Sequence, residues 1–277
     1  MSIQPKEIAP GVYCMEAGKG ITRSNVYFVR SGSAWVLIDA ASANCGRSIQ
    51  KTAESLFGVN TRPASILLTH HHPDHAGSAL ELARMWDCPV YVHPDELPLA
   101  TSGDLLTFRR YANPLDRWVV LPLLRAMPPR RVASMLSKTS LKGIARAFDP
   151  GVAVPDLPDW ECIPTPGHTP GHISFFRNND RFLIAGDAFL TVDLKSFWGL
   201  LLWGLRLNNK QRVSVQPWYT TWNRQAAKES VAALAMLEPH VLACGHGTPM
   251  TDEGTARELR AFAGHFSGYA AKEHTKA

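Results

Sequence analysis

The sequence has few cysteines and no long apolar run, and each shortage excludes a class of protein. The five cysteines of the 277-residue chain form no Cys-x-x-Cys pair, which excludes a disulfide-rich scaffold and predicts a reducing, cytoplasmic location. The longest uncharged apolar stretch, 197–205, has nine residues, whereas a bilayer-spanning helix needs about 20. The first residues have no apolar core, so we expect no secretory signal. The remaining composition, 45% hydrophobic and 19% charged, is typical of a globular protein.

Positive charge is concentrated in one segment of the chain. Residues 101–150 contain nine Lys or Arg and three acidic residues, whereas the rest of the chain carries 20 basic and 21 acidic residues. A basic segment can meet an anionic substrate, a membrane surface or nucleic acid, or it can be a solvated helical face. Because we find no nucleic-acid recognition motif and no alternation of aromatic and basic residues, we do not expect a nucleic-acid partner. A membrane surface remains an alternative partner of the basic segment.

Alternation and helical spacing predict an α/β chain. Strands are expected at 11–16, 25–30, 34–39, 64–69, 89–92, 160–164, 173–177, 181–185 and 240–244. Helices are expected at 49–56, 79–86, 227–234 and 251–266, where apolar residues recur every three or four positions. Between the two sets lies a proline-bearing segment, 101–148, that predicts short helices. This order favours a layered domain of two similar halves over a doubly wound parallel sheet.

Histidine and aspartate cluster most densely just after the strand expected at 64–69, in the run Thr-His-His-His-Pro-Asp-His. His70 and His72 are two positions apart in extended chain, so both rings leave on the same side. Asp74 and His75 follow where the chain turns into a helix, so they can point at a neighbouring position. Imidazoles beside a carboxylate suit zinc or a similar transition metal.

Three further strand ends carry side chains of the same chemistry. His168 lies in the loop Thr-Pro-Gly-His-Thr-Pro-Gly-His, Asp187 follows Ala-Gly, and His246 lies in Cys-Gly-His-Gly. Side chains at the ends of rigid strands hold a site's geometry better than side chains on long loops. We therefore expect these residues to join the first cluster at one edge of the sheets.

In this order and with these gaps, the four motifs resemble the metallo-β-lactamase-fold hydrolase superfamily over nearly the whole chain. The sequence motifs around His70 and His168 are similar to those of hydroxyacylglutathione hydrolases and lactonases. However, only 31 residues follow His246, so the helical glutathione-binding domain of the former is expected to be shortened or absent. The resemblance implies α/β architecture in a single domain, 1–277: a four-layer αββα sandwich with a basic helical insertion at about 101–148.

The resemblance also implies the roles of individual residues. The implied ligands are His70, His72 and His168 for one divalent cation, and Asp74, His75 and His246 for a second, with Asp187 bridging both. Zinc is the favoured metal, with iron and manganese as alternatives. Asp39 and His172 would support the ligands from behind, and His71 would face away. A hydroxide shared by the two metals would attack the substrate, with Asp74 accepting and donating the proton.

An aromatic segment at 189–222 is the second unusual feature. It contains Phe197, Trp198, Trp203, Trp218, Tyr219 and Trp222. These side chains are equally compatible with a hydrophobic cleft above the metals, an interface, and ordinary core. Our hypothesis is a lid, formed with the insertion, that binds the apolar portion of a small-molecule substrate.

The function expected from this site is cleavage of an ester, lactone or thioester bond by a di-metal hydrolase. The alternatives are a mononuclear iron oxygenase of the persulfide dioxygenase type on the same fold, and a phosphoester hydrolase. The partner expected is a small-molecule substrate, and a dimer is compatible with the sequence.

Overall fold

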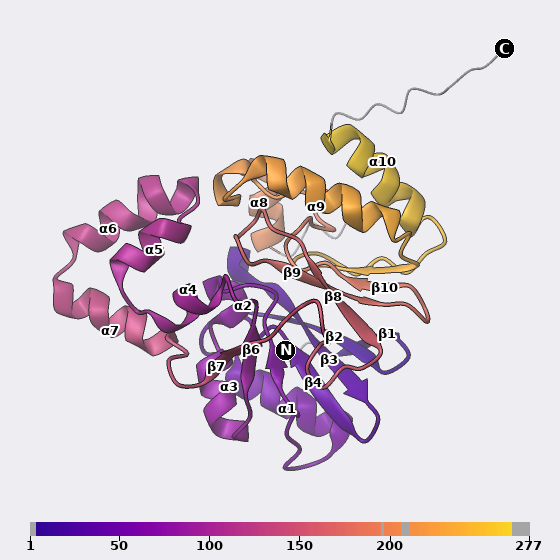
Figure 1. The fold of residues 1–277 in the computed structure, drawn as a ribbon, viewed down its shortest axis with the longest axis horizontal. Helices are drawn as coiled ribbons and strands as arrows, with labels where there is room; N and C mark the ends of the chain where they lie inside the picture. The colour runs from indigo at the N-terminus through magenta and orange to yellow at the C-terminus, as the bar shows by residue number, and fades with distance from the viewer. Residues whose placement is uncertain (1–3, 195–196, 206–210, 268–277) are drawn as a thin grey trace.

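Two β-sheets packed face to face form the centre of the computed structural model, which describes residues 4–194, 197–205 and 211–267 (Figure 1). Within these residues the first sheet has seven strands in the order β1 to β7, and the second has four in the order β11-β10-β9-β8. Side chains from both inner faces fill the space between the sheets, and Tyr27 and Phe175 are among those that solvent does not reach.

The first sheet and its covering helices come from the N-terminal half of the chain. Its strands are β1 (Lys6–Ala9), β2 (Val12–Ala17), β3 (Ser24–Ser31), β4 (Ala34–Ile38), β5 (Ile66–Leu67), β6 (Val90–Val92) and β7 (Ala145–Ala147). Neighbours are antiparallel from β1 to β4 and parallel from β4 to β7. Helices α1 (Gly46–Phe57) and α3 (Ala79–Trp86) cover its outer face, where Ile49 and Leu82 are fully buried.

The second sheet and its helices come from the C-terminal half. Its strands are β8 (Trp160–Pro164), β9 (Ile173–Arg177), β10 (Phe182–Ile184) and β11 (Val241–Ala243). Helices α9 (Arg224–Met236) and α10 (Thr255–Ser267) cover its outer face, because Val231, Leu234 and Leu259 pack on Phe176 and Leu183. Helices, two sheets and helices therefore form four layers (Figure 1), which confirms the predicted αββα sandwich.

The insertion is helical, as predicted, and stands beside the sandwich (Figure 1). It follows α4 (Leu97–Thr101) and consists of α5 (Leu105–Tyr111), the π-helical turn η2 (Asp116–Val120), α6 (Leu121–Ala126) and α7 (Pro129–Thr139). The insertion, expected to end at about 148, ends a few residues earlier, because residues 145–147 form β7 and pair with β6 at the edge of the first sheet. Three residues are too few for an alternating pattern, so this strand has no signature in the sequence.

Most predicted helices and strands are present. The predicted and observed bounds differ where only a few residues show the apolar periodicity. The helix predicted at 79–86 is α3, whereas the strand predicted at 64–69 is hydrogen-bonded as a strand only at Ile66–Leu67. β1 was not predicted, since only one of its four residues is buried. The aromatic segment contains the helix α8 (Phe197–Gly204) and the short helix η3 (Trp218–Thr220). No helix among the described residues is both long enough and apolar enough to cross a bilayer.

Candidate metal centre

The predicted ligands lie in loops that leave the strands at one edge of the two sheets. Strands β4 and β5 are parallel, as are β10 and β11, so the loops that follow them emerge at the carboxyl edge of each sheet. Asp39, His70, Asp187 and His246 follow these four strands within three residues of their ends. His168 lies in the loop between β8 and β9. The fold thus gathers predicted ligands that are up to 176 positions apart in the chain, from His70 to His246.

Three imidazoles form the first group of the site. The Nε2 atom of His70 lies 3.1 Å from Nδ1 of His72, which lies 2.8 Å from Nε2 of His168. Neighbouring nitrogen ligands of a tetrahedral zinc ion are about 3.3 Å apart. Three ring nitrogens at this spacing, from residues that are buried or half-buried, fit one cation between them.

A carboxylate and two imidazoles form the second group. The Nε2 atom of His246 lies 3.3 Å from Oδ2 of Asp74 and 3.5 Å from Nε2 of His75. These atoms are also spaced as ligands of one ion would be. The short helix α2 (Pro73–Ala76) carries Asp74 and His75, and it begins directly after His72.

Asp187 lies between the two groups. Its Oδ1 is 3.5 Å from Nε2 of His75, and its Oδ2 is 3.5 Å from Nε2 of His168 and 3.4 Å from Nε2 of His246. Among the described residues its buried Oδ1 has no hydrogen-bond partner. A Cβ atom on Gly245 would overlap that oxygen and approach the His75 ring, so glycine is required there. A buried carboxylate that faces both groups fits a bridging ligand.

Hydrogen bonds behind the ligands fix which ring nitrogen faces the site. The Thr69 hydroxyl donates to Oδ2 of Asp39, at 2.9 Å, so its oxygen accepts from Nδ1 of His70, at 3.0 Å. Asp39 also accepts from Nδ1 of His75, at 2.8 Å. Each ring therefore carries a proton on Nδ1, which leaves Nε2 as the nitrogen that faces the site and can bind a metal. Asp39 holds this position with a φ of 60°, which aspartate tolerates better than most residues.

Strand β3 holds the loop that carries His246. The Nδ1 atom of His246 donates to the carbonyl oxygen of Arg23, at 2.6 Å. The side chains of Asn25 and Tyr27 donate to the carbonyl oxygen of Cys244, at 2.9 and 2.6 Å. The first strands of the chain thus orient a ligand from its last third, across the space between the two sheets.

His172 supports Asp187 from behind. Its Nε2 accepts from the backbone N–H of Asp187, at 2.9 Å, and its Nδ1 lies 2.8 Å from the Thr165 hydroxyl. Burial lowers the pKa of His172 to about 4, so the ring is neutral and its Nε2 lone pair is available to that N–H.

Glu96 is a supporting residue that the sequence analysis missed. The fully buried carboxylate accepts from the backbone N–H of His71, at 2.8 Å, and from that of Gly171, at 3.0 Å. It therefore ties the loop of His70 and His72 to the loop of His168. One feature of the sequence could have indicated it: Glu96 follows β6 by four residues, at the edge of the sheet that also carries His70.

Burial and neighbouring charges divide the histidines into two kinds. Burial and the surrounding imidazoles hold the pKa values of His70 and His168 well below the usual value, so both are neutral and ready to bind a metal. Burial also acts to lower the pKa of His75 and of His246, but nearby carboxylates, Asp187 above all, outweigh it. The pKa of His75 is raised well above its usual value and that of His246 to about 10.

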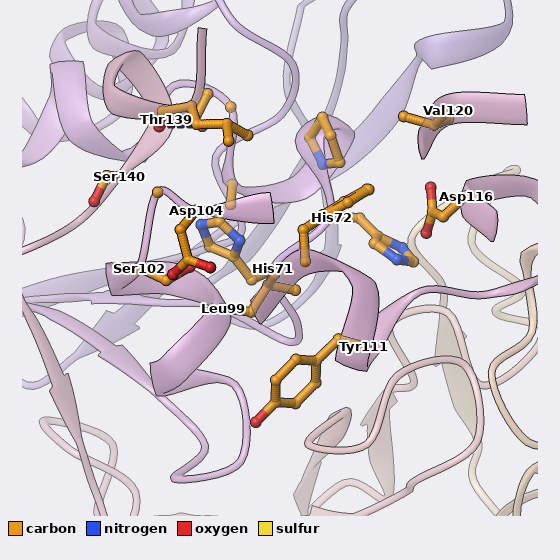
Figure 2. A pocket seen from close by; sticks show the side chains of 16 residues that line it. His71, His72, Leu99, Ser102, Asp104, Tyr111, Asp116, Val120, Thr139 and Ser140 are labelled. Carbon is orange, nitrogen blue, oxygen red and sulfur yellow. Dashed lines mark hydrogen bonds between the residues drawn. The ribbon is translucent and has the colours of Figure 1, made fainter. Parts of the chain in front are cut away.

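Two adjoining cavities open beside the ligands. The larger, of about 590 Å³, is lined by Asp74, His168, Asp187 and His246. The smaller, of about 210 Å³, is mostly apolar and shares His72 and Asp116 with the larger. Its walls include Leu99, Phe108, Tyr111, Val120 and Leu136. Figure 2 shows the His71 ring directed toward Asp104 and Ser102, and the His72 ring toward Asp116. His71 thus faces away from the metal ligands, as expected, and enters the side cavity.

The aromatic residues proposed as substrate contacts lie in different places. Tyr219 lines the larger cavity. Trp203 is buried against Leu190 and stacks on the Arg23 guanidinium, and it lines neither cavity. Trp218 borders a separate hollow, and the Trp222 backbone N–H donates to the carbonyl oxygen of His168. The side chains of Phe197 and Trp198 lie outside the described part of the chain.

The family of the chain follows from comparison with known proteins. Residues 20–246 match the family model of the metallo-beta-lactamase superfamily. The chain belongs to the metallo-beta-lactamase superfamily. The match spans all seven predicted ligands, from His70 to His246.

Individual members of the superfamily agree with this assignment. A probable metallo-hydrolase of Bacillus subtilis, YflN, is 35% identical over 94% of this chain and 93% of its own. A hydroxyacylglutathione hydrolase of Bdellovibrio bacteriovorus is 28% identical, but over only 45% of this chain and 34% of its own. The crystal structure of TTHA1623 in a di-iron-bound form is 25% identical, with a TM-score of 0.56, over 88% of this chain and 98% of its own. The hydroxyacylglutathione hydrolase branch therefore has weak support, whereas the superfamily and its fold are shown.

Proposed function

We propose that the protein is a di-metal hydrolase that cleaves an ester, lactone or thioester in a small molecule with an apolar portion. One observation carries this proposal. Seven candidate ligand side chains converge in two groups, with Asp187 between them, and five of the seven line a cavity large enough for a substrate. The similarity to metallo-hydrolases supports the same reaction class.

Each part of the centre has a role in such a reaction. A pair of divalent cations, when bound, lowers the pKa of a water molecule and polarises the carbonyl of the substrate. Asp187 keeps the two groups at a fixed separation, because its carboxylate faces both. Asp74 is the proposed proton acceptor and donor, since it is half-buried and lines the larger cavity. Although burial favours its neutral form, His246 and His75 hold its pKa well below the usual value, so it is ionised near neutral pH.

The side cavity is the observation that supports a substrate with an apolar portion. It opens from the metal centre at His72 and Asp116, and its walls are mostly carbon. A carbonyl at the metals would leave the adjoining chain or ring able to extend between Phe108, Val120 and Leu136. Burial of each methylene there contributes about 0.8 kcal/mol to binding.

Zinc is the metal we propose, with iron and manganese as alternatives. The seven candidate ligands are five imidazoles and two carboxylates, and no cysteine belongs to the groups found among the described residues. This donor set accommodates zinc, iron or manganese. The di-iron-bound form of TTHA1623 supports two metals on this fold. We also propose a cytoplasmic location, which the five free cysteines support.

A substrate screen tests the proposed function. Purified protein loaded with zinc, iron or manganese would be assayed on aryl esters, lactones, acyl thioesters and phosphoesters. We expect turnover of at least one carbonyl substrate, lost on chelation and restored by metal. Turnover of phosphoesters alone would replace the proposal with the phosphoester alternative. No turnover of any of these substrates would contradict hydrolysis.

One observation favours a second candidate, a mononuclear iron oxygenase. His70, His75 and Asp187 form a further group within ligand distance of one another, and two histidines with one carboxylate are the ligands of many oxygen-activating iron sites. Oxygen consumption with a persulfide substrate, together with one iron per chain, would establish it in place of the hydrolase.

A further inference from the structure

A helix of the insertion exposes an apolar stripe to solvent. The π-helical turn η2 runs directly into α6, and Trp118, Val119, Pro122 and Leu123 recur along it at the spacing of one helical face. Trp118 is 81% exposed, Leu123 is 62% exposed and Val119 is 47% exposed. A stripe with this spacing normally faces a core, whereas here it faces outward.

The opposite face of this helix is already packed against the protein. Leu121 and Leu124 are buried, and Asp116 and Val120 line the side cavity. The outer stripe is therefore not the face that attaches the helix to its own domain. Within the described ranges 4–194, 197–205 and 211–267, no other part of the chain covers the exposed side chains of Trp118, Val119 and Leu123.

Exposed arginines are frequent on the helices that carry and adjoin the apolar stripe. Arg117 and Arg125 flank it on the same helix, and the exposed residues Arg109, Arg110, Arg130 and Arg131 lie on the neighbouring helices α5 and α7. The acidic residues of these helices do not balance them. Asp104 caps the start of α5 through the backbone N–H groups of Leu106 and Thr107, and Asp116 faces the cavities. A partner that fits this surface offers negative charge outside and an apolar interior.

We propose that the outer face of residues 115–126 docks on an anionic lipid surface, with Trp118 and Leu123 in the headgroup region and the arginines on the lipid phosphates. Amphipathic helices with tryptophan and leucine on one side and arginine at the flanks bind at this depth. A second copy of the chain fits less well, because a two-fold contact would bring the same arginines together. The inner face of the docked helix lines the side cavity, so an apolar substrate could pass from the lipid to the metal centre.

Vesicle flotation tests the docking surface without any need for turnover. The full-length protein would be mixed with vesicles of phosphatidylcholine alone, or of phosphatidylcholine with phosphatidylserine. We expect binding to the second kind only, with a bound fraction that falls as salt is added. The variant Trp118→Asp/Leu123→Asp should bind at least about tenfold more weakly, and Arg117→Gln should bind about fivefold more weakly.

A matched control separates this surface from general hydrophobicity. Val59 is also 81% exposed but follows α1, outside the insertion, so Val59→Asp should bind vesicles as the wild type does. Unchanged melting temperatures would show that the variants fold. Failure of the wild type to bind either kind of vesicle would overturn the proposal, as would undiminished binding by the double variant. A dimer in light scattering that the double variant converts to monomer, without vesicle binding by the wild type, would assign the surface to a second copy instead.

Discussion

The metal centre and the helical insertion differ in how firmly the surrounding structure holds them. Three of the five ligand rings, those of His70, His75 and His246, hydrogen-bond through the nitrogen that faces away from the site, and five of the seven ligands are buried. The insertion instead joins the sandwich along one side, and it exposes Leu106 and Trp118. Strand ends therefore position the candidate ligands, while the insertion forms part of the wall of the adjoining cavity.

The largest effect should come from the carboxylate that joins the two metal groups. Asp187→Asn keeps the shape of the side chain but removes the charge that faces His75, His168 and His246. Since loss of supporting groups alone costs 10–100-fold, we expect kcat/KM to fall by at least about a hundredfold. Steady-state assays with metal in excess would measure this. Asp180→Asn, at a surface ion pair with Arg177, serves as control, and equal activity of both variants would contradict the bridging role.

A smaller effect should follow from loss of support behind the ligands. Asp39→Asn leaves His70, through Thr69, and His75 without the carboxylate that fixes their tautomers. We expect metal affinity to fall by about 10–100-fold, measured by competition with a chromophoric chelator. If affinity were unchanged, the carboxylate would have no part in orienting the rings.

The two kinds of histidine predict a pH dependence of metal binding. In the metal-free protein His246, with its pKa raised to about 10, and His75 are protonated at neutral pH. A metal needs their lone pairs, so binding must release these protons. Affinity should therefore rise with pH, by roughly tenfold per unit for each proton released, until the pH passes the raised pKa values. Calorimetry in buffers of different ionisation enthalpy would count the protons, and a count of zero would contradict this account.

Glu96 offers a test of how the two ligand loops are joined. Glu96→Ala leaves the buried N–H groups of His71 and Gly171 without their acceptor. We expect Glu96→Ala to lower the free energy of unfolding by about 2–4 kcal/mol. Glu96→Gln should lower it by a smaller amount. Urea denaturation with chelator present would measure both. A loss below about 0.5 kcal/mol would mean that water replaces the carboxylate at little cost.

The smallest and most selective effect should come from the insertion. Leu136→Trp fills part of the side cavity, so we expect KM for long-chain acyl esters to rise by about tenfold, with little change for acetyl esters. The neighbouring Met135 is exposed on the same helix. Met135→Trp should leave KM unchanged for long-chain and for acetyl esters. Equal effects on long and short substrates would show that the cavity does not bind the acyl chain.

The sequence predicted best what depends on many residues in a regular pattern. Most strands and helices follow from apolar periodicity, and α3 carries four buried residues at helical spacing. The four-layer αββα arrangement was implied by the resemblance to the superfamily. The ligands were recognisable because each follows a strand, and strand ends meet at one edge. Glu96 was missed because a single buried carboxylate has no pattern of its own. The position of Trp203 in the core, away from the cavities, depends on contacts with Arg23 and Leu190 that are distant in the chain.

The central claim is that one pocket holds two cations in two separable groups. Elemental mass spectrometry of purified protein, reconstituted with metal and then freed of excess, tests it most directly. We expect two equivalents of metal per chain in the wild type and about one in His246→Ala, which removes a ligand of the second group only. One equivalent or none in the reconstituted wild type would contradict it.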